Sequence, residues 1–196
     1  TDPRVLAAFT AVSRAALLDA DQRGHAYDDA PLPIGFGQTI SQPYIVALTA
    51  QALRLTGDEC VLEIGTGSGY AAAILGVLAR EVHTIERIPA LAHRAAARLA
   101  ALGLANVHVH VGDGSLGWPA AAPYDAIAVS AAAPHPPRAL LDQLARGGRL
   151  VLPTGTADDQ QLVRITRRGA DDLVREDLGA VRFVPLVGAD AWPEPA

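Results

Sequence analysis

The stretch VLEIGTGSGYAAAIL, residues 61–75, decides the fold class of this chain. Its short apolar start predicts a buried strand, and its alanine-rich end predicts a helix. Between them lie Gly65, Gly67 and Gly69, which let the backbone turn sharply and let a ligand come close to the main chain. The stretch therefore predicts a strand, a glycine loop and a helix that together bind a cofactor.

The spacing of the glycines separates two classes of cofactor. A dinucleotide fingerprint, G-x-G-x-x-G, counted from Gly65 needs glycine or alanine at position 70, where the chain has Tyr70. The pattern is instead acidic-x-Gly-x-Gly-x-Gly, beginning at Glu63. A carboxylate at this strand end suits a ligand with a positive amino group, which a pyrophosphate lacks. The pattern resembles motif I of the class I S-adenosylmethionine-dependent methyltransferases.

Strand and helix patterns alternate after residue 59. Strands are expected in CVLEIG, VHTIE, VHVHVGDG, DAIAVS and RLVLPT, with helices over 70–79, 89–102 and 136–146. This order predicts an α/β fold with a mostly parallel sheet and helices on both faces. LVRITR (162–167) and VRFVPLV (181–187) predict antiparallel strands at the C-terminal side. Residues 5–18 and the segment after Pro43 predict helices, and residues 24–43 predict a loop.

Three acidic residues follow three successive predicted strands. Glu63 lies in the first, Glu86 ends the second, and Asp113 follows the third. Ligands of open α/β sheets bind at the edge where the strands end. We expect Glu86 to accept the two ribose hydroxyls and Asp113 to accept the adenine amino group, with Gly114 leaving room for the ring. Each acid alone has a plainer interpretation as a solvated cap.

Composition excludes several classes of function. The chain has 196 residues, is half hydrophobic and has a net charge of −5. Its longest basic run is Arg167-Arg168, and the segment SAAAP after the fourth strand lacks the Asn/Asp-Pro-Pro-aromatic motif of base methylation, so we expect no nucleic-acid partner. We also expect no membrane span and no signal peptide. One cysteine, Cys60, favours a reducing compartment and hence the cytoplasm.

Six histidines raise the question of a metal site. His108 and His110 alternate on one predicted strand face, but no third ligand has recognisable spacing along the chain. We therefore expect a solvated or hydrogen-bonded pair and no metal.

Nearly the whole chain resembles the bacterial protein-L-isoaspartate (D-aspartate) O-methyltransferases. The resemblance rests on PIGFGQTISQP (33–43), VLEIGTGSGY, VHTIERI, VGDG, PYDAIAVSAAAP, LLDQLARGGRLVLPTG and VRFVPLV, of which PIGFGQTISQP is the most specific. It implies one Rossmann-like domain over residues 1–196: N-terminal helices and a substrate loop over 1–57, the S-adenosylmethionine-binding core over 58–155, and C-terminal strands over 156–196. We also expect a monomer.

The resemblance implies methyl transfer from S-adenosylmethionine to the α-carboxylate of L-isoaspartyl residues, with D-aspartyl residues as a second candidate substrate, which starts protein repair through a succinimide. S-adenosylhomocysteine is the implied product. Ser41 matches the active-site serine of the family. The implied cofactor-binding residues are Thr39, Ile40, Glu63, Gly65, Thr66, Gly67, Gly69, Glu86, Asp113 and Gly114.

Three alternatives stay open at this point. Ser41 could instead cap the helix that begins near Pro43. The enzyme could methylate a small molecule or one specialised peptide. The chain could also be a catalytically inactive module that only binds S-adenosylmethionine, although the intact Thr39-Ile40-Ser41 segment argues against this.

Overall fold

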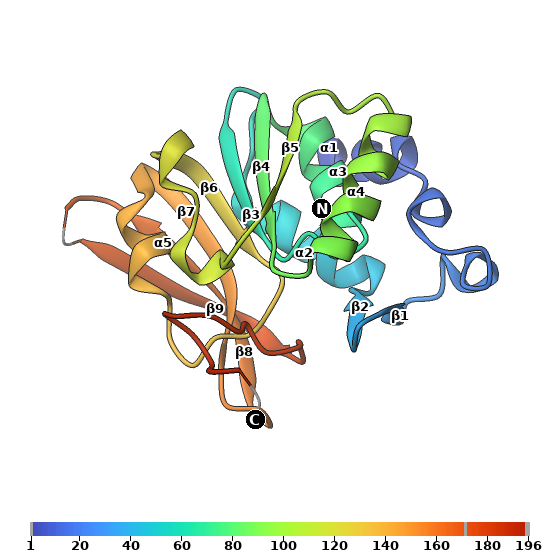
Figure 1. Cartoon of the computed structure of the whole chain (residues 1–196). Coiled ribbons are helices and arrows are strands. Elements are labelled where there is room, and N and C mark those ends of the chain that lie inside the picture. The colour runs from blue at the N-terminus through green and yellow to red at the C-terminus, as the bar shows by residue number, and fades with distance from the viewer. Residues whose placement is uncertain (1, 171, 195–196) are drawn as a thin grey trace.

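A seven-stranded sheet forms the centre of the molecule (Figure 1). The computed structural model describes residues 2–170 and 172–194. Neighbouring strands are parallel from β5 to β7, whereas β8 and β9 run antiparallel to their neighbours, so the predicted mixed sheet is confirmed. The spatial order is β5-β4-β3-β6-β7-β8-β9, with β3 (Cys60–Ile64), β4 (Glu81–Glu86), β5 (Val107–Val111), β6 (Tyr124–Val129), β7 (Leu144–Gly155), β8 (Gln160–Arg167) and β9 (Leu173–Val181).

Helices cover both faces of the sheet, as predicted. Side chains along a strand alternate between the faces, so Val61 of β3 joins one apolar layer and Leu62 joins the other. The first layer holds residues of α1 (Pro3–Ala11), α2 (Pro43–Leu53), α3 (Tyr70–Leu78) and α4 (Pro89–Ala101). The second holds Leu140 of α5 (Arg138–Asp142) and Leu186 near the C-terminus. Figure 1 shows α5 on the opposite side of the sheet from α1, α3 and α4.

The N-terminal helix is shorter than the predicted span of residues 5–18. α1 ends at Ala11, and a separate 3₁₀ turn follows over Arg14–Leu17. The hydroxyl of Ser13 accepts a hydrogen bond from the backbone N–H of Ala16 at 3.4 Å and caps this turn. Serine hydroxyls offer the backbone such local bonds in competition with a continuing helix. The break turns Arg14 into the protein, where it is fully buried.

A β-hairpin occupies part of the predicted loop over residues 24–43. β1 (Leu32–Gly35) pairs antiparallel with β2 (Gln38–Ile40). At the tip, Gly35, Phe36 and Gly37 have φ angles of 88°, 54° and 68°. Two of these three positive values fall on glycine, which adopts them without steric cost. The proline-rich sequence therefore builds a rigid two-stranded arm rather than an irregular loop.

Two elements near the C-terminus differ from the prediction. The helix expected over 136–146 ends at Asp142, because Leu144 already pairs with Tyr124 as the first residue of β7. The prediction of a strand over 181–187 is wrong, because the last strand of the sheet is β9 (Leu173–Val181). β9 carries the charged run Arg175, Glu176, Asp177, which hides its strand pattern.

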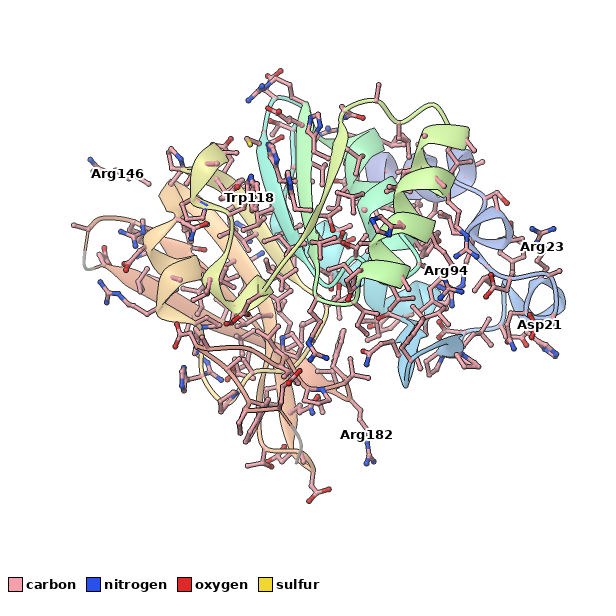
Figure 2. The ribbon with its side chains drawn as sticks, in the orientation of Figure 1. Asp21, Arg23, Arg94, Trp118, Arg146 and Arg182 are labelled. Carbon is pink, nitrogen blue, oxygen red and sulfur yellow. The ribbon has the colours of Figure 1, made fainter. Side chains whose placement is uncertain are left out.

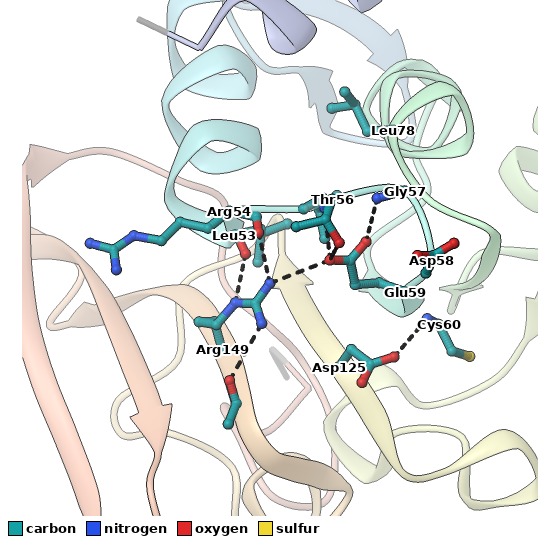
Figure 3. Close-up of polar contacts among 12 residues, drawn as sticks. Leu53, Arg54, Thr56, Gly57, Asp58, Glu59, Cys60, Leu78, Asp125 and Arg149 are labelled. Atoms are coloured by element: carbon teal, nitrogen blue, oxygen red, sulfur yellow. Dashed lines mark hydrogen bonds and ion pairs between the residues drawn. The ribbon is translucent and has the colours of Figure 1, made fainter.

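The segment between α2 and β3 is held by one carboxylate (Figure 3). Glu59 accepts hydrogen bonds from the N–H groups of Thr56 and Gly57 and from the Thr56 hydroxyl, at 2.7–2.8 Å. Arg149 of β7 lies 3.9 Å from the same carboxylate and donates to the carbonyls of Leu53 and Arg54. These bonds satisfy the carbonyls at the end of α2 and fix the helix that follows the hairpin onto the sheet.

Candidate active site

A cavity opens at the carboxyl ends of the parallel strands, beside the end of the hairpin. Ten of its lining residues come from the hairpin with Ser41 and from the glycine loop with the start of α3; the others come from α2, from the ends of β3, β4 and β6, from the turn after β5 and from the C-terminal segment. They are Gln38, Thr39, Ile40, Ser41, Val46, Ile64, Gly65, Thr66, Gly67, Ser68, Tyr70, Ala71, Ile85, Glu86, Arg87, Gly114, Ser130, Ala131, Val184, Pro185, Leu186 and Val187. The structure thus brings together eight of the eleven predicted site residues.

The glycine loop forms the floor of the cavity. Gly65, Gly67 and Gly69 have φ angles of 92°, 54° and 90°, which residues other than glycine rarely adopt. The N–H of Gly65 bonds to the carbonyl of Ile85 at 2.9 Å, so the loop is tied to the end of β4. A Cβ on Gly69 would lie 3.4 Å from Ala95 and Leu99 of α4, which is an ordinary contact distance. Gly69 therefore serves the turn of the loop through its positive φ angle, and it does not line the cavity.

Glu86 is the carboxylate that lines the cavity at the end of β4. One of its oxygens accepts from the N–H of Gly67 at 2.9 Å, and the other accepts from the N–H of Ile88 at 3.0 Å. These two bonds fix the carboxylate in place, because backbone donors have no rotational freedom. Each carboxylate oxygen has a second lone pair free for a ligand hydroxyl. The position fits the expected acceptor of a ribose.

Glu63 does not reach the cavity surface. Its side chain is fully buried, and one oxygen accepts from the Thr84 hydroxyl at 2.6 Å. The Thr84 oxygen lies 2.6 Å from the hydroxyl of Thr66, which does line the cavity. Burial raises the pKa of Glu63 to about 8, against the opposing effect of the Thr84 bond, and the charge of Glu86 adds to the rise. A chain of hydroxyls thus links a buried carboxyl group to the cofactor loop, and a direct role of Glu63 stays a prediction.

Asp113 also lies outside the cavity lining. One of its oxygens accepts from the N–H and hydroxyl of Ser115, and the other accepts from the N–H of Ala189 at 2.7 Å. Its carboxylate therefore anchors the C-terminal segment, and the expected bond to adenine stays a prediction. Gly114 does line the cavity; a Cβ there would fall 2.3 Å from Ile64, so the position requires glycine for packing.

Ser41 lies where the hairpin meets α2, at the junction of the main cavity and two smaller hollows. The alternative that Ser41 caps α2 is wrong. Gln42 is the N-cap residue, without a capping side chain, and the N–H of Tyr44 bonds to Asp29 instead. Within the described part of the chain, the Ser41 hydroxyl makes no hydrogen bond. It is therefore available to a ligand.

Arg14 is a site residue that the sequence did not reveal. Its guanidinium donates to the carbonyl of Ser41 at 2.5 Å and to the carbonyl of Ala30 at 3.3 Å, and it lies over the ring of Tyr70, 5.1 Å from the centroid. Burial lowers its pKa, although the tyrosine and Asp29 oppose the shift. The only signal in the sequence was one arginine within the apolar run VSRAALL. Arg14 thus fixes the backbone that carries the Ser41 hydroxyl.

Arg94 of α4 supports the hairpin from the other side. It donates to the carbonyl of Ile34 in β1 at 2.7 Å, and its guanidinium lies 5.9 Å from the centre of the Phe36 ring. Figure 2 shows Arg94 at the border between α4 and the N-terminal segment. The hairpin is therefore held at both of its ends by buried or half-buried arginines.

A hollow on the far side of Ser41 adjoins the main cavity. It is lined by Pro31, Thr39, Ser41, Gln42, Ile45, Ser130, Arg182, Phe183 and Val184. Arg182 is exposed and points away from the body of the protein (Figure 2). Val184 continues into the main cavity, where the carbonyl of Val184 and the N–H of Leu186 both bond to Ala132. This hollow supplies an apolar surface next to the free hydroxyl, with the exposed Arg182 at its edge (Figure 2).

Comparison with known proteins identifies close relatives. A family model described as protein-L-isoaspartate(D-aspartate) O-methyltransferase matches residues 1–191. The chain is 61% identical over 199 residues to protein-L-isoaspartate O-methyltransferase 1 of Rhodopseudomonas palustris (strain HaA2), covering 99% of this chain and 81% of the relative. It is 59% identical over 198 residues to protein-L-isoaspartate O-methyltransferase of Rhodopseudomonas palustris (strain ATCC BAA-98 / CGA009), covering 100% of this chain and 91% of the relative.

Solved structures agree on the fold. A structure titled protein-L-isoaspartate O-methyltransferase superposes with a TM-score of 0.87 at 27% identity, covering 97% of this chain and 62% of that one. This chain therefore spans less than two thirds of that protein. A Plasmodium falciparum structure, titled as a putative protein-L-isoaspartate O-methyltransferase in complex with S-adenosyl-L-homocysteine, superposes with a TM-score of 0.83 at 23% identity. The match covers 95% of this chain and 91% of that one. The sheet is the Rossmann-like fold of these methyltransferases.

Proposed function

The chain belongs to the protein-L-isoaspartate(D-aspartate) O-methyltransferase family, and from this premise we propose how its residues carry out the reaction. It is an enzyme that transfers a methyl group from S-adenosylmethionine to the α-carboxylate of L-isoaspartyl residues in peptides and proteins, with S-adenosylhomocysteine as product. The methyl ester closes to a succinimide, whose hydrolysis returns part of the residue to normal aspartate. The role of the family is repair.

The main cavity fits an adenosine-type ligand. Its apolar walls come from Ile64, Ile85 and Leu186, and the missing side chain of Gly114 widens it near the end of β3. Glu86 offers fixed acceptors for two hydroxyls. S-adenosylmethionine supplies an electrophilic methyl group on a positively charged sulfur. The Glu86 carboxylate and an open glycine loop suit that charge better than they suit a pyrophosphate.

Ser41 is the proposed catalytic residue, through orientation of the acceptor. The α-carboxylate of a peptide is ionised at neutral pH, with an unperturbed pKa of about 3.5, so the reaction needs no strong general base. The free hydroxyl of Ser41 donates a hydrogen bond to one carboxylate oxygen and leaves the other to attack. Fixing two reactants in this way converts a bimolecular step into an effectively unimolecular one. Arg14 contributes by holding the Ser41 carbonyl.

The hollow beside Ser41 is the proposed site of the peptide. Phe183, Ile45 and Pro31 give it apolar walls, and Arg182 gives it a positive charge near the mouth. An isoaspartyl residue bears a free α-carboxylate that a normal aspartyl residue in a chain lacks. A cation near the mouth attracts such an anion, although solvent weakens the attraction at an exposed site.

We further propose that the enzyme acts as a monomer in the cytoplasm, without a nucleic-acid partner. The net charge of −5 opposes binding to phosphates. Among the described residues, no helix is long and apolar enough to cross a membrane. Light scattering during size-exclusion chromatography tests the monomer, since a mass near 20.3 kDa is expected.

The decisive test is radiolabelled methyl transfer to a matched peptide pair. One peptide carries an L-isoaspartyl residue and the other carries normal aspartate in the same sequence. We expect base-labile methyl esters on the first peptide and none on the second. Labelling of both peptides alike would point to another substrate class, and cofactor binding without any transfer would point to an inactive binding module.

A further inference from the structure

A second cluster of reactive side chains lies at the opposite edge of the sheet. Cys60 is the first residue of β3 and Glu81 is the first residue of β4, whereas the cofactor cavity lies at the other ends of these strands. The register pairs Cys60 with Glu81 and His83 with His108 of β5. Because side chains alternate along strands, these four side chains point to the same face of the sheet.

The ligand atoms of this cluster converge. The sulfur of Cys60, a carboxylate oxygen of Glu81 and a ring nitrogen of His83 all lie within 4.8 Å of one another. Nε2 of His83 is 3.4 Å from Oε1 of Glu81, and Nε2 of His108 is also 3.4 Å from that oxygen. Nitrogen and oxygen ligands about 2.0–2.1 Å from a tetrahedral Zn²⁺ ion are separated by roughly 3.3–3.4 Å. The two 3.4 Å separations match that geometry.

We propose that Cys60, Glu81 and His83 bind a divalent transition metal ion of the Zn²⁺ type, with His108 as the fourth ligand. Thiolate, imidazole and carboxylate together are a donor set for Zn²⁺, whereas Mg²⁺ and Ca²⁺ prefer oxygen ligands alone. The sulfur lies within 4.8 Å of the ligand atoms of Glu81 and His83, so it needs to move by at most about 1.3 Å to reach the tetrahedral separation of roughly 3.5 Å from them. A rotation about the Cα–Cβ bond of Cys60 provides such a movement.

The surroundings of His83 resemble the outer contacts of a metal-bound histidine. Its Nδ1 lies 3.0 Å from Nε2 of His110. When His83 donates from Nδ1 to His110, its Nε2 presents a lone pair toward Glu81, and two acceptors then face each other unless a cation or a proton lies between them. Metal-bound histidines commonly use their second nitrogen in this way. The His110 ring in turn stacks on Trp118, with centroids 3.9 Å apart, and Figure 2 shows where Trp118 lies.

An entry path exists. The side chain of His108 is 45% exposed and that of Glu81 is 34% exposed, whereas Cys60 is buried. An ion can therefore enter from solvent between His108 and Glu81. Because the site joins three neighbouring strands, a bound ion is expected to act structurally, and it does not depend on the proposed methyl transfer.

Metal binding is tested with the full chain after treatment with a chelator. Equilibrium dialysis against Zn²⁺ and elemental analysis should give one ion per wild-type chain. His83→Gln and Cys60→Ser should each weaken binding by at least tenfold, whereas His93→Gln, which changes an exposed histidine of α4, should bind as the wild type does. Less than stoichiometric binding by the wild type, or equal binding by His83→Gln and His93→Gln, would overturn the proposal.

Two measurements guard against variants that fold poorly. Co²⁺ added to the wild type should give the strong visible bands of tetrahedral cobalt and a thiolate charge-transfer band in the near ultraviolet. Zn²⁺ at about 100 times its dissociation constant should raise the Tm of the wild type by about 5 °C or more. Weak octahedral cobalt bands without the thiolate band would also refute the site, whatever the variants do.

Discussion

Replacing Glu63 with glutamine should remove much of the pH dependence of stability. Glu63 is fully buried, with one oxygen bonded to Thr84 and the other without a partner in the described part of the chain. Burial raises its pKa to about 8, whereas an unfolded glutamate has a pKa near 4.5. The folded protein therefore keeps a proton that the unfolded chain has lost over the range between these two values.

Proton linkage gives the sign and the size of this pH dependence of the free energy of unfolding. The stabilisation from protonated Glu63 is present in full below about pH 4.5 and is lost as the pH rises toward about 8. Across this window the free energy of unfolding falls by about 1.4 kcal/mol per pH unit, or about 2–3 kcal/mol between pH 5 and pH 7. Glutamine has nearly the same shape and does not titrate, so Glu63→Gln should lose this slope.

Urea denaturation followed by circular dichroism at pH 5, 6, 7 and 8 measures the effect. The difference between the wild type and Glu63→Gln removes the contribution of every other titrating group. Glu194→Gln is the control, because it changes a glutamate whose side chain is 75% exposed. Parallel stability curves for the wild type and Glu63→Gln would refute the raised pKa.

Four further predictions concern the site. Ser41→Ala should lower kcat by at least tenfold while the cofactor Kd stays within about twofold; equal losses in methyl-transfer and calorimetric assays would contradict an orienting role. Glu86→Gln should raise the cofactor Kd by about tenfold or more, measured by calorimetry, because charge-assisted hydrogen bonds are lost; unchanged affinity would remove Glu86 from the site. Arg14→Met should leave the carbonyl of Ser41 unsatisfied, which costs about 1–3 kcal/mol in urea denaturation and lowers kcat; full activity at lower stability would limit Arg14 to folding. Arg182→Gln should raise the KM for the isoaspartyl peptide by about twofold to fivefold at low salt and less at high salt, whereas Arg175→Gln should not.

Much of the core was predictable from local sequence. The central strands β3, β4 and β6 are short apolar runs, and the glycine loop directly follows β3. Hydrophobic periodicity and the spacing of the glycines were therefore enough to predict them. Pro43 was correctly expected in the first turn of α2. The position of Glu86 at the cavity was also predictable, because the ends of parallel strands meet at one edge.

The contacts that depend on distant residues were not predictable. Arg14 reaches the Ser41 carbonyl across 27 positions of sequence, and nothing in its own neighbourhood signals this. Asp113 follows a strand as expected, but its carboxylate bonds to Ala189 near the other end of the chain. His83 and Glu81 lie on the strand beside His108, so no ligand spacing along one strand reveals the cluster. Sequence patterns report periodicity along a strand, whereas neighbours across the sheet depend on register.

The hairpin makes one wall of the cavity while strand ends and the glycine loop make its floor. The arm is anchored through the backbone, by Arg14 at the Ser41 carbonyl and by Arg94 at the carbonyl of Ile34. Main-chain anchors tolerate changes of the side chains between them. Phe36 at the tip is exposed and lies outside the cavity lining, so its side chain can change without altering the cavity itself. Natural selection or laboratory evolution can thus broaden or narrow the range of damaged peptides that the enzyme accepts. Such changes leave the glycine loop and the strand ends, which form the cofactor cavity, undisturbed.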